Sequence, residues 1–329
     1  MQILFVGCPA IAVPSLRVLS DLELEGRGVT LAGVLTNPDS KRGRHGLDEP
    51  TDISAASSAL DLVRKERGFP PIPQLKPEKL DAQARKEVAA LSPELLVSFA
   101  YGHIFGPRFL ALFPMGGINI HPSLLPKYRG ASPIPAVILC REKETGICIQ
   151  KLGPEMDAGA ILAQDCFELS GQETTSSLSE TVARRAALLL RELLLNFDSR
   201  LASARPQEGE AVYCREIKRE AGLIDWNKSA VEIEAQIRAY TPWPLSFTSL
   251  GNDTLFILEA RPLDLVKTFS EAEQAAPGTV LGIDKNQGIL IQTGNGILAV
   301  TRLQLQAKKA MDWKAFCNGR RDFTGARLG

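Results

Sequence analysis

Short apolar runs alternate with amphipathic segments along the first hundred residues. Continuous apolar runs of the kind that form buried strands occur at 2–7, 29–36 and 95–100. Helical patterns occur near 10–20, at 51–67 and at 77–90. This alternation of strand, helix and strand predicts an α/β fold with a doubly wound parallel sheet.

The second half of the chain shows a different pattern. ETGICIQKL at 144–152 and ILAQDCFEL at 161–169 predict a later strand pair around the loop GPEMDAG, and a long amphipathic helix follows near 174–197. The polar segment 199–211 has the composition of a linker, and beyond it several short β-like runs predict a small β-barrel. We therefore expect three parts, which are a domain over 1–198, a linker over 199–211 and a smaller domain over 212–329.

Composition narrows the class of protein. A chain of 329 residues can bury two hydrophobic cores. Its net charge is zero, so no overall electrostatic field attracts nucleic acid or membrane, and a polyanion would have to bind at local basic patches. The six cysteines form no Cys-x-x-Cys pair and the three histidines have no ligand spacing, which predicts reduced thiols, a cytoplasmic protein and no metal. No apolar run reaches the roughly 20 residues that span a bilayer, so we expect no membrane contact.

Two motifs for nucleotide binding or nucleophilic catalysis are weak here. Gly7 is followed by Cys8 and Pro9 without the further glycines of a dinucleotide fingerprint, so a nucleotide cofactor is disfavoured. Ser123 follows His121 too closely along an extended chain to pair with it, so covalent catalysis is disfavoured as well.

The segment GGINIHPSLLPKYRGASPI at 116–134 contains the strongest candidate chemistry. Asn119 and His121 are two residues apart in a strand-like run, so their side chains point to the same side of the chain. An imidazole exchanges protons near neutral pH, and an amide can donate to an oxyanion during acyl transfer. Asp157, in the later loop, could orient the histidine. The alternative is that all three only cap local backbone.

Basic residues form two further candidates. Lys41, Arg42 and Arg44 lie in the polar loop 37–50. Residues 302–327 contain seven cations against two aspartates, a local excess of five positive charges. Cations on a β-barrel suit contact with a phosphate backbone, whereas a solvated tail is the alternative interpretation.

The motifs together resemble a known family. Asn-x-His-x-Ser-Leu-Leu-Pro-x-x-Arg-Gly-Ala-x-Pro-Ile at 119–134, Glu144-Thr145-Gly146 and Met156-Asp157-Ala158-Gly159 are similar to the formyltransferases that use 10-formyltetrahydrofolate. IDWNKSAVEIEAQIRAYTPWP at 224–244, PGTVL at 277–281 and TGNGIL at 293–298 narrow the resemblance to the initiator-tRNA branch of that family. Pro122 and the loop 39–50, which contains acidic Asp48 and Glu49, depart from the pattern of that branch.

The resemblance implies a Rossmann-like catalytic domain and a barrel of the oligonucleotide-binding type. It implies transfer of a formyl group to the amine of methionyl-initiator tRNA, with Asn119, His121 and Asp157 as the catalytic trio. The residues that would hold the folate are Phe99, Ala100, Tyr101, Gly102, Ser123, Leu124, Leu125, Pro126, Gly153 and Met156. Those that would contact tRNA are Arg42, Arg44, Lys308 and Lys309.

Other functions stay open at this point. The same trio could serve a formyltransferase or a formyl-folate hydrolase that acts on a small amine such as an aminosugar nucleotide. A non-catalytic tRNA-binding protein on the same scaffold is a further alternative. We expect a monomer, because nothing in the sequence suggests a surface for self-association.

Overall fold

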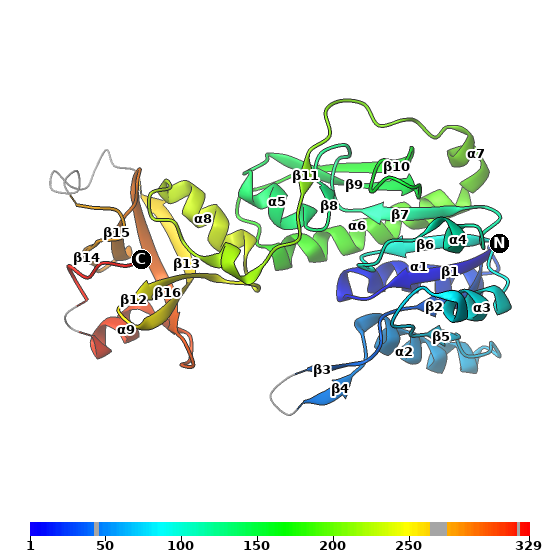
Figure 1. Ribbon diagram of the computed structural model, residues 1–329, viewed down its shortest axis with the longest axis horizontal. Coiled ribbons are helices and arrows are strands. Elements are labelled where there is room, and N and C mark those ends of the chain that lie inside the picture. Colours follow the sequence, from blue (N-terminus) through cyan, green and yellow to red (C-terminus); the bar gives the residue numbers. More distant parts are fainter. Residues whose placement is uncertain (43–45, 264–274, 321–322) are drawn as a thin grey trace. The chain divides into compact units, whose positions relative to one another are not determined.

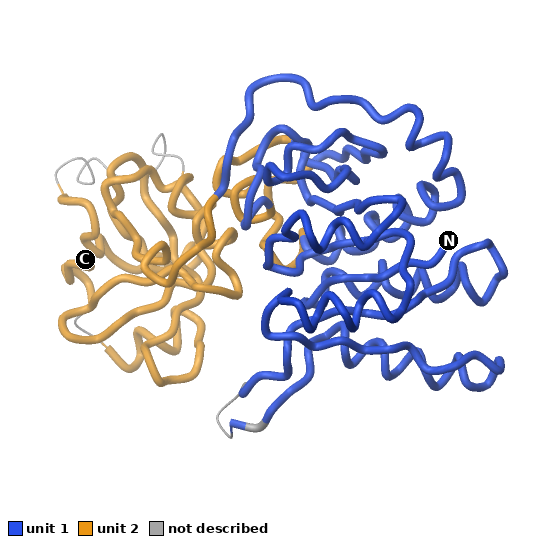
Figure 2. Tube along the Cα trace, turned by 45° about the vertical axis from the view of Figure 1, so that its right-hand side comes forward, with its two compact units in different colours: residues 1–133, 144–168, 179–214 blue, residues 134–143, 169–178, 215–329 orange. Residues whose placement is uncertain are grey.

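The computed structural model describes residues 1–42, 46–263, 275–320 and 323–329. Its chain divides into two compact units, which are coloured separately in Figure 2. Unit 1 contains residues 1–133, 144–168 and 179–214, and unit 2 contains residues 134–143, 169–178 and 215–329.

Unit 1 is built on a mixed sheet of seven strands, in the order β10-β9-β7-β6-β1-β2-β5. Its strands are β1 (Gln2–Gly7), β2 (Thr30–Leu35), β5 (Gln74–Leu75), β6 (Leu95–Phe99), β7 (Gly117–His121), β9 (Glu144–Lys151) and β10 (Ile161–Glu168) (Figure 1). The first five of these are parallel, whereas β9 is antiparallel to β7 and β10 is antiparallel to β9. The predicted α/β fold with a parallel central sheet is confirmed.

Local sequence explains where the helices of unit 1 begin. The Thr51 hydroxyl accepts from the backbone N–H of Ser54, and the Asp81 carboxylate accepts from the N–H groups of Gln83 and Ala84. The helix predicted from residue 77 therefore starts only after the Asp81 cap. The helices are η1 (Ala10–Ala12), α1 (Val13–Leu24), α2 (Asp52–Glu66), α3 (Ala82–Ala90), α4 (Pro107–Leu110), α6 (Thr175–Leu195), whose first turn belongs to unit 2, and α7 (Phe197–Ala202).

Two short strand pairs lie outside the main sheet. The polar loop 37–50 contains a hairpin of β3 (Ser40–Arg42) and β4 (Leu47–Glu49), which the sequence did not predict. β8 (Arg129–Gly130) pairs in parallel with β11 (Tyr213–Cys214). The pairing of β8 with β11 holds the segment after α7 against the loop that follows β7.

Unit 2 is built on an antiparallel sheet of six strands among its described residues, with β17 beside β16. The strands are β12 (Ser246–Leu250), β13 (Asp253–Leu263), β14 (Val280–Asp284), β15 (Gly288–Gln292), β16 (Ile297–Leu305) and β17 (Met311–Asp312), and the helices are α5 (Pro133–Leu139), η2 (Arg219–Gly222), α8 (Ala230–Ala239) and α9 (Trp313–Gly319). A capping box of Ser229 and Glu232 starts α8. Trp226 lies in the core, where its indole N–H donates to the Thr248 hydroxyl at 3.0 Å.

The grouping into units differs in detail from the predicted domains. Residues 199–211, predicted as a linker, contain the end of α7 and belong to unit 1, whereas α5 belongs to unit 2. The boundaries at residues 198 and 212 stay a prediction. Among the described residues, no helix is both long and apolar enough to cross a membrane.

Candidate active site

The candidate site begins at the end of β7, where two polar side chains follow an apolar run. β7 lies between parallel β6 and antiparallel β9, so Asn119 has Ser98 and Gln150 as its cross-strand partners, and His121 has Cys148. The loops after β6 and β7 leave the sheet at the same edge, which is where open α/β sheets place their ligands (Figure 1).

His121 is almost completely buried and has one partner at each ring nitrogen. Nε2 lies 2.8 Å from the carbonyl oxygen of Tyr128, and Nδ1 lies 3.5 Å from Oδ1 of Asp157. A carbonyl only accepts hydrogen bonds, so Nε2 carries the hydrogen of the neutral ring. In that tautomer Nδ1 presents its lone pair toward Asp157.

Asp157 is held by two donors. Oδ2 accepts from the backbone N–H of Gly130 at 2.8 Å, and Oδ1 accepts from Nε2 of Gln150 at 2.8 Å. The backbone of Asp157 is left-handed, with φ of +53°. Two residues later a Cβ on Gly159 would lie 1.8 Å from the carbonyl oxygen of Lys151, so only glycine allows the loop to approach β9 so closely.

Burial controls the charge of the histidine. Removal from water lowers the pKa of His121, and the Arg129 cation acts in the same direction, while the Asp157 carboxylate and the Tyr128 carbonyl oppose this effect. The lowered pKa favours the neutral form of the imidazole. It stands next to a carboxylate that stabilises the imidazolium once a proton arrives.

Asn119 differs from its neighbours in having an uncommitted amide. It is half-buried, and its side chain makes no hydrogen bond with the part of the chain that the structure describes. The trio thus combines an available amide, a neutral imidazole and a carboxylate. Such a set can stabilise an oxyanion and receive a proton.

The residues predicted to hold folate lie at the end of β6 and in the loops after β6, β7 and β9. Phe99 ends β6 in the core, Ala100 is exposed with φ of +52°, and Gly102 is exposed with φ of +87°. Tyr101 is buried and stacks on Phe105 with ring centroids 5.7 Å apart, and burial raises the pKa of its phenol. The side chains of Phe99 and Tyr101 therefore support the loop, and its backbone is what faces solvent.

The loop after β7 is likewise held from inside. Ser123 is fully buried and donates from Oγ to the carbonyl oxygen of Lys127 at 2.6 Å, and Leu125 and Pro126 are buried too. Leu124 packs against Gly146, where a Cβ would lie 2.4 Å from its Cδ2. In the next loop Gly153 is half-buried and Met156 is 52% exposed, which leaves the Met156 side chain able to cover a ligand.

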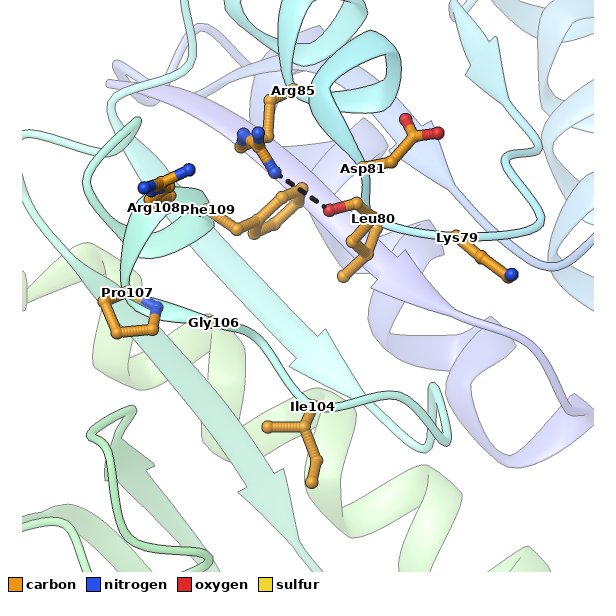
Figure 3. A pocket seen from close by; sticks show the side chains of 9 residues that line it. All are labelled: Lys79, Leu80, Asp81, Arg85, Ile104, Gly106, Pro107, Arg108 and Phe109. Atoms are coloured by element: carbon orange, nitrogen blue, oxygen red, sulfur yellow. Dashed lines mark hydrogen bonds between the residues drawn. The ribbon is translucent and has the colours of Figure 1, made fainter.

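A surface pocket lies beside the loop after β6 (Figure 3). It is lined by Lys79, Leu80, Asp81, Arg85, Ile104, Gly106, Pro107, Arg108 and Phe109. None of the predicted site residues lines it. Among the described residues no group of three His, Cys, Asp or Glu side chains is placed to hold a metal.

The predicted tRNA contacts are placed only in part. Lys308 and Lys309 are exposed in the turn after β16, and Arg42 ends β3, whereas Arg44 lies outside the described residues. Acidic residues of β13 neutralise part of the excess positive charge of residues 302–327. Arg302 forms an ion pair with Glu259 at 3.1 Å, and Arg320 forms one with Asp253 at 2.9 Å.

Sequence reasoning missed three contributors to the site, which are the Tyr128 carbonyl, Gln150 and Gln207. Gln150 had a usable signal, since it is a polar residue within the buried run of β9 and is 1% exposed. Gln207 had none, because it lies in a polar segment among other hydrophilic residues.

Comparisons with known proteins identify the family of the chain. Residues 11–194 match the family model "Formyl transferase", and residues 216–321 match "Formyl transferase, C-terminal domain". The chain is 49% identical over 325 residues to a methionyl-tRNA formyltransferase of Treponema denticola, covering 98% of each chain.

Solved structures share the fold. HypX from Aquifex aeolicus in complex with tetrahydrofolic acid has a TM-score of 0.60 at 16% identity, covering 98% of this chain and 48% of that one. Methionyl-tRNA formyltransferase from Clostridium thermocellum has a TM-score of 0.53 at 17% identity, covering 81% of this chain and 95% of that one.

Proposed function

This chain belongs to the formyltransferase family, and we propose that it transfers the formyl group of 10-formyltetrahydrofolate to the α-amino group of methionyl-initiator tRNA. One geometric observation carries the proposal. A buried imidazole lies 3.5 Å from a carboxylate and two residues along the same strand from an available amide. We assign the catalytic roles to Asn119, His121 and Asp157.

The reaction requires a neutral amine. Its nitrogen attacks the formyl carbon, which gives a tetrahedral oxyanion, and the bond from that carbon to the folate nitrogen then breaks. The amine loses a proton and the departing folate nitrogen gains one, so no oxidant or metal is needed for the balance. Asn119 donates from its side-chain amide to the oxyanion.

His121 and Asp157 manage the proton. Nε2 is engaged with the Tyr128 carbonyl, so Nδ1 is the atom that receives the proton, directly or through a water. Asp157 stabilises the imidazolium that forms, and His121 then returns the proton toward the folate nitrogen. The lowered pKa of His121 favours this return.

We propose that the pterin ring of the folate lies against the backbone of residues 96–102 and 152–157. Ala100 and Gly102 are exposed and have small side chains or none, which lets a pterin approach the backbone of the first of these loops. The relative HypX was solved with tetrahydrofolic acid, which supports a folate for this fold. Ser123, Leu124, Leu125, Pro126, Gly153 and Met156 complete the proposed site.

For the tRNA we propose contacts from two places. Arg42 and Arg44 reach the acceptor end, and Lys308 and Lys309 contact the phosphate backbone from unit 2. We propose that the enzyme works as a monomer in the cytoplasm. The alternative acceptor that the sequence left open, a small amine such as an aminosugar nucleotide, is not favoured by the relatives, which are methionyl-tRNA formyltransferases.

A formylation assay tests the proposal. The protein is incubated with 10-formyltetrahydrofolate and, in separate reactions, with methionyl-initiator tRNA, a dTDP-linked aminosugar or water alone. We expect formyl-methionyl-tRNA as the product at a rate far above that of the other reactions. A formylated sugar in its place would establish the alternative, and tetrahydrofolate release without an acceptor would establish a hydrolase.

A further inference from the structure

The segment 204–214, which we call the strap, runs along the loops of the candidate site. Arg205 exchanges two backbone hydrogen bonds with Ile161, at 2.8 and 3.0 Å, and β11 at the far end of the strap pairs with β8. The strap lies between the two matched family segments, 11–194 and 216–321. Within it, Gln207 is half-buried and turns its side chain toward the loop of Asp157.

The orientation of the Gln207 amide follows from its neighbours. Its Oε1 accepts from Nε and Nη2 of Arg129, at 3.1 and 2.8 Å. A guanidinium has only donors, so the oxygen of Gln207 must face it. The nitrogen therefore points the other way, where it donates to the backbone carbonyls of Asp157 at 2.7 Å and Gly159 at 2.9 Å.

The two hydrogens of that nitrogen serve three acceptors, so one hydrogen is shared with a second amide. Nε2 of Gln207 lies 3.2 Å from Oε1 of Gln150. With its oxygen on that side, Gln150 presents its own nitrogen to Oδ1 of Asp157 at 2.8 Å. This is the carboxylate oxygen that lies 3.5 Å from Nδ1 of His121. A reversed Gln150 would set its oxygen against the carboxylate, where neither group can donate.

We propose that Gln207 is a positioning residue for the formyl-transfer site. Arg129 fixes the orientation of the Gln207 amide, and the Gln207 nitrogen then favours the orientation of Gln150 in which its oxygen faces Gln207. In that orientation Gln150 donates to the Asp157 carboxylate and holds it beside His121. Testing this role by measuring enzyme activity depends on the proposed function, whereas the hydrogen bonds themselves do not.

The test replaces Gln207 by methionine, which has similar length and no hydrogen bonds to give. The matched control is Gln164→Met on β10, because Gln164 is exposed and only accepts from Nη2 of Arg205, at 2.6 Å. We expect kcat to fall on the order of 100-fold in Gln207→Met, as for a misplaced reacting group, with the KM for the folate donor close to wild type. The control keeps wild-type values of both.

A second measurement is independent of the acceptor. The chain has three histidines, so the imidazole ¹⁵N resonances of His121 can be assigned by comparison with His121→Gln. We expect these resonances, which report charge and tautomer, to shift in Gln207→Met and to stay in place in Gln164→Met. If Gln207 only fastened the strap, its replacement would lower Tm and leave both the resonances and kcat per folded molecule unchanged.

The outcomes separate the two proposals. Unchanged resonances and unchanged kcat in folded Gln207→Met overturn the positioning role. A wild-type protein that forms no formyl-methionyl-tRNA overturns the proposed function, while the resonances still decide the role of Gln207. If Gln207→Met does not fold, Gln207→Glu keeps the partner of Arg129 and removes the donor, and we expect the same fall in kcat.

Discussion

The Asp157→Asn substitution is the most direct test of the candidate site, because it changes charge and hydrogen bonding with almost no change in shape. Both partners of the carboxylate are donors, namely the N–H of Gly130 and Nε2 of Gln150. Whichever way the new amide turns, its nitrogen faces one of them. One buried hydrogen bond is therefore lost, which costs about 1–3 kcal/mol of stability.

The effect on catalysis comes from the charge. At 3.5 Å and an effective dielectric constant of about 20, a carboxylate and an imidazolium attract by roughly 5 kcal/mol. A 100-fold loss of rate corresponds to an increase of about 2.7 kcal/mol in the activation free energy. Losing about half of the attraction between the carboxylate and the imidazolium is enough to produce it. We expect kcat to fall at least 100-fold in Asp157→Asn.

The assay measures formylation of methionyl-tRNA and, separately, unfolding by urea. Asp165→Asn is the matched control, because Asp165 forms a bidentate pair with Arg185 at 2.6 and 2.7 Å on the same unit. Asp165→Asn keeps wild-type kcat. Wild-type kcat in Asp157→Asn, with only a loss of stability, would refute the reasoning and leave Asp157 as a structural turn residue.

Three further predictions follow from the site and the basic residues. Asn119→Ala removes an oxyanion donor, so kcat falls roughly 100- to 1,000-fold with an unchanged circular dichroism spectrum; near-normal turnover would contradict the role. Burial lowers the pKa of His121, so below about pH 6.5 the unfolded chain binds a proton that the folded chain does not. The free energy of unfolding therefore decreases as the pH is lowered below this value. In His121→Gln this part of the pH dependence disappears from urea titrations, and its persistence would assign it to other groups. Arg44→Ala raises the KM for methionyl-tRNA more than the KM for folate, and tRNA binding weakens steeply with salt in filter-binding measurements; equal effects on both substrates would argue against the acceptor-end contact.

The fold was predictable where burial leaves a periodic signal in the sequence. β1 and β6 are continuous apolar runs because both faces of a central parallel strand are covered. The hairpin of β3 and β4 was missed because its strands are polar and short, so no alternation marks them. The start of α3 was misplaced by five residues, from 77 to Ala82, because the Asp81 cap decided the boundary.

For the candidate site, the sequence could predict only those relationships that depend on neighbouring positions along one strand. A period of two along an extended chain is enough to place Asn119 and His121 on one side of β7. It could not show that Nε2 of His121 is engaged by the Tyr128 carbonyl, which leaves Nδ1 as the atom for proton transfer.

The α/β class, the candidate trio and the resemblance to formyltransferases could be predicted without coordinates, because strand patterns and motif spacing are local properties of the chain. The hydrogen bond from Gln207 to the loop of Asp157 is visible only in three dimensions, because Gln207 lies 50 residues further along the chain in a segment with the composition of a linker. Side-chain hydrogen bonds depend on distance and direction in space, and a half-buried glutamine in a polar segment leaves no periodic trace by which the sequence could reveal its partners.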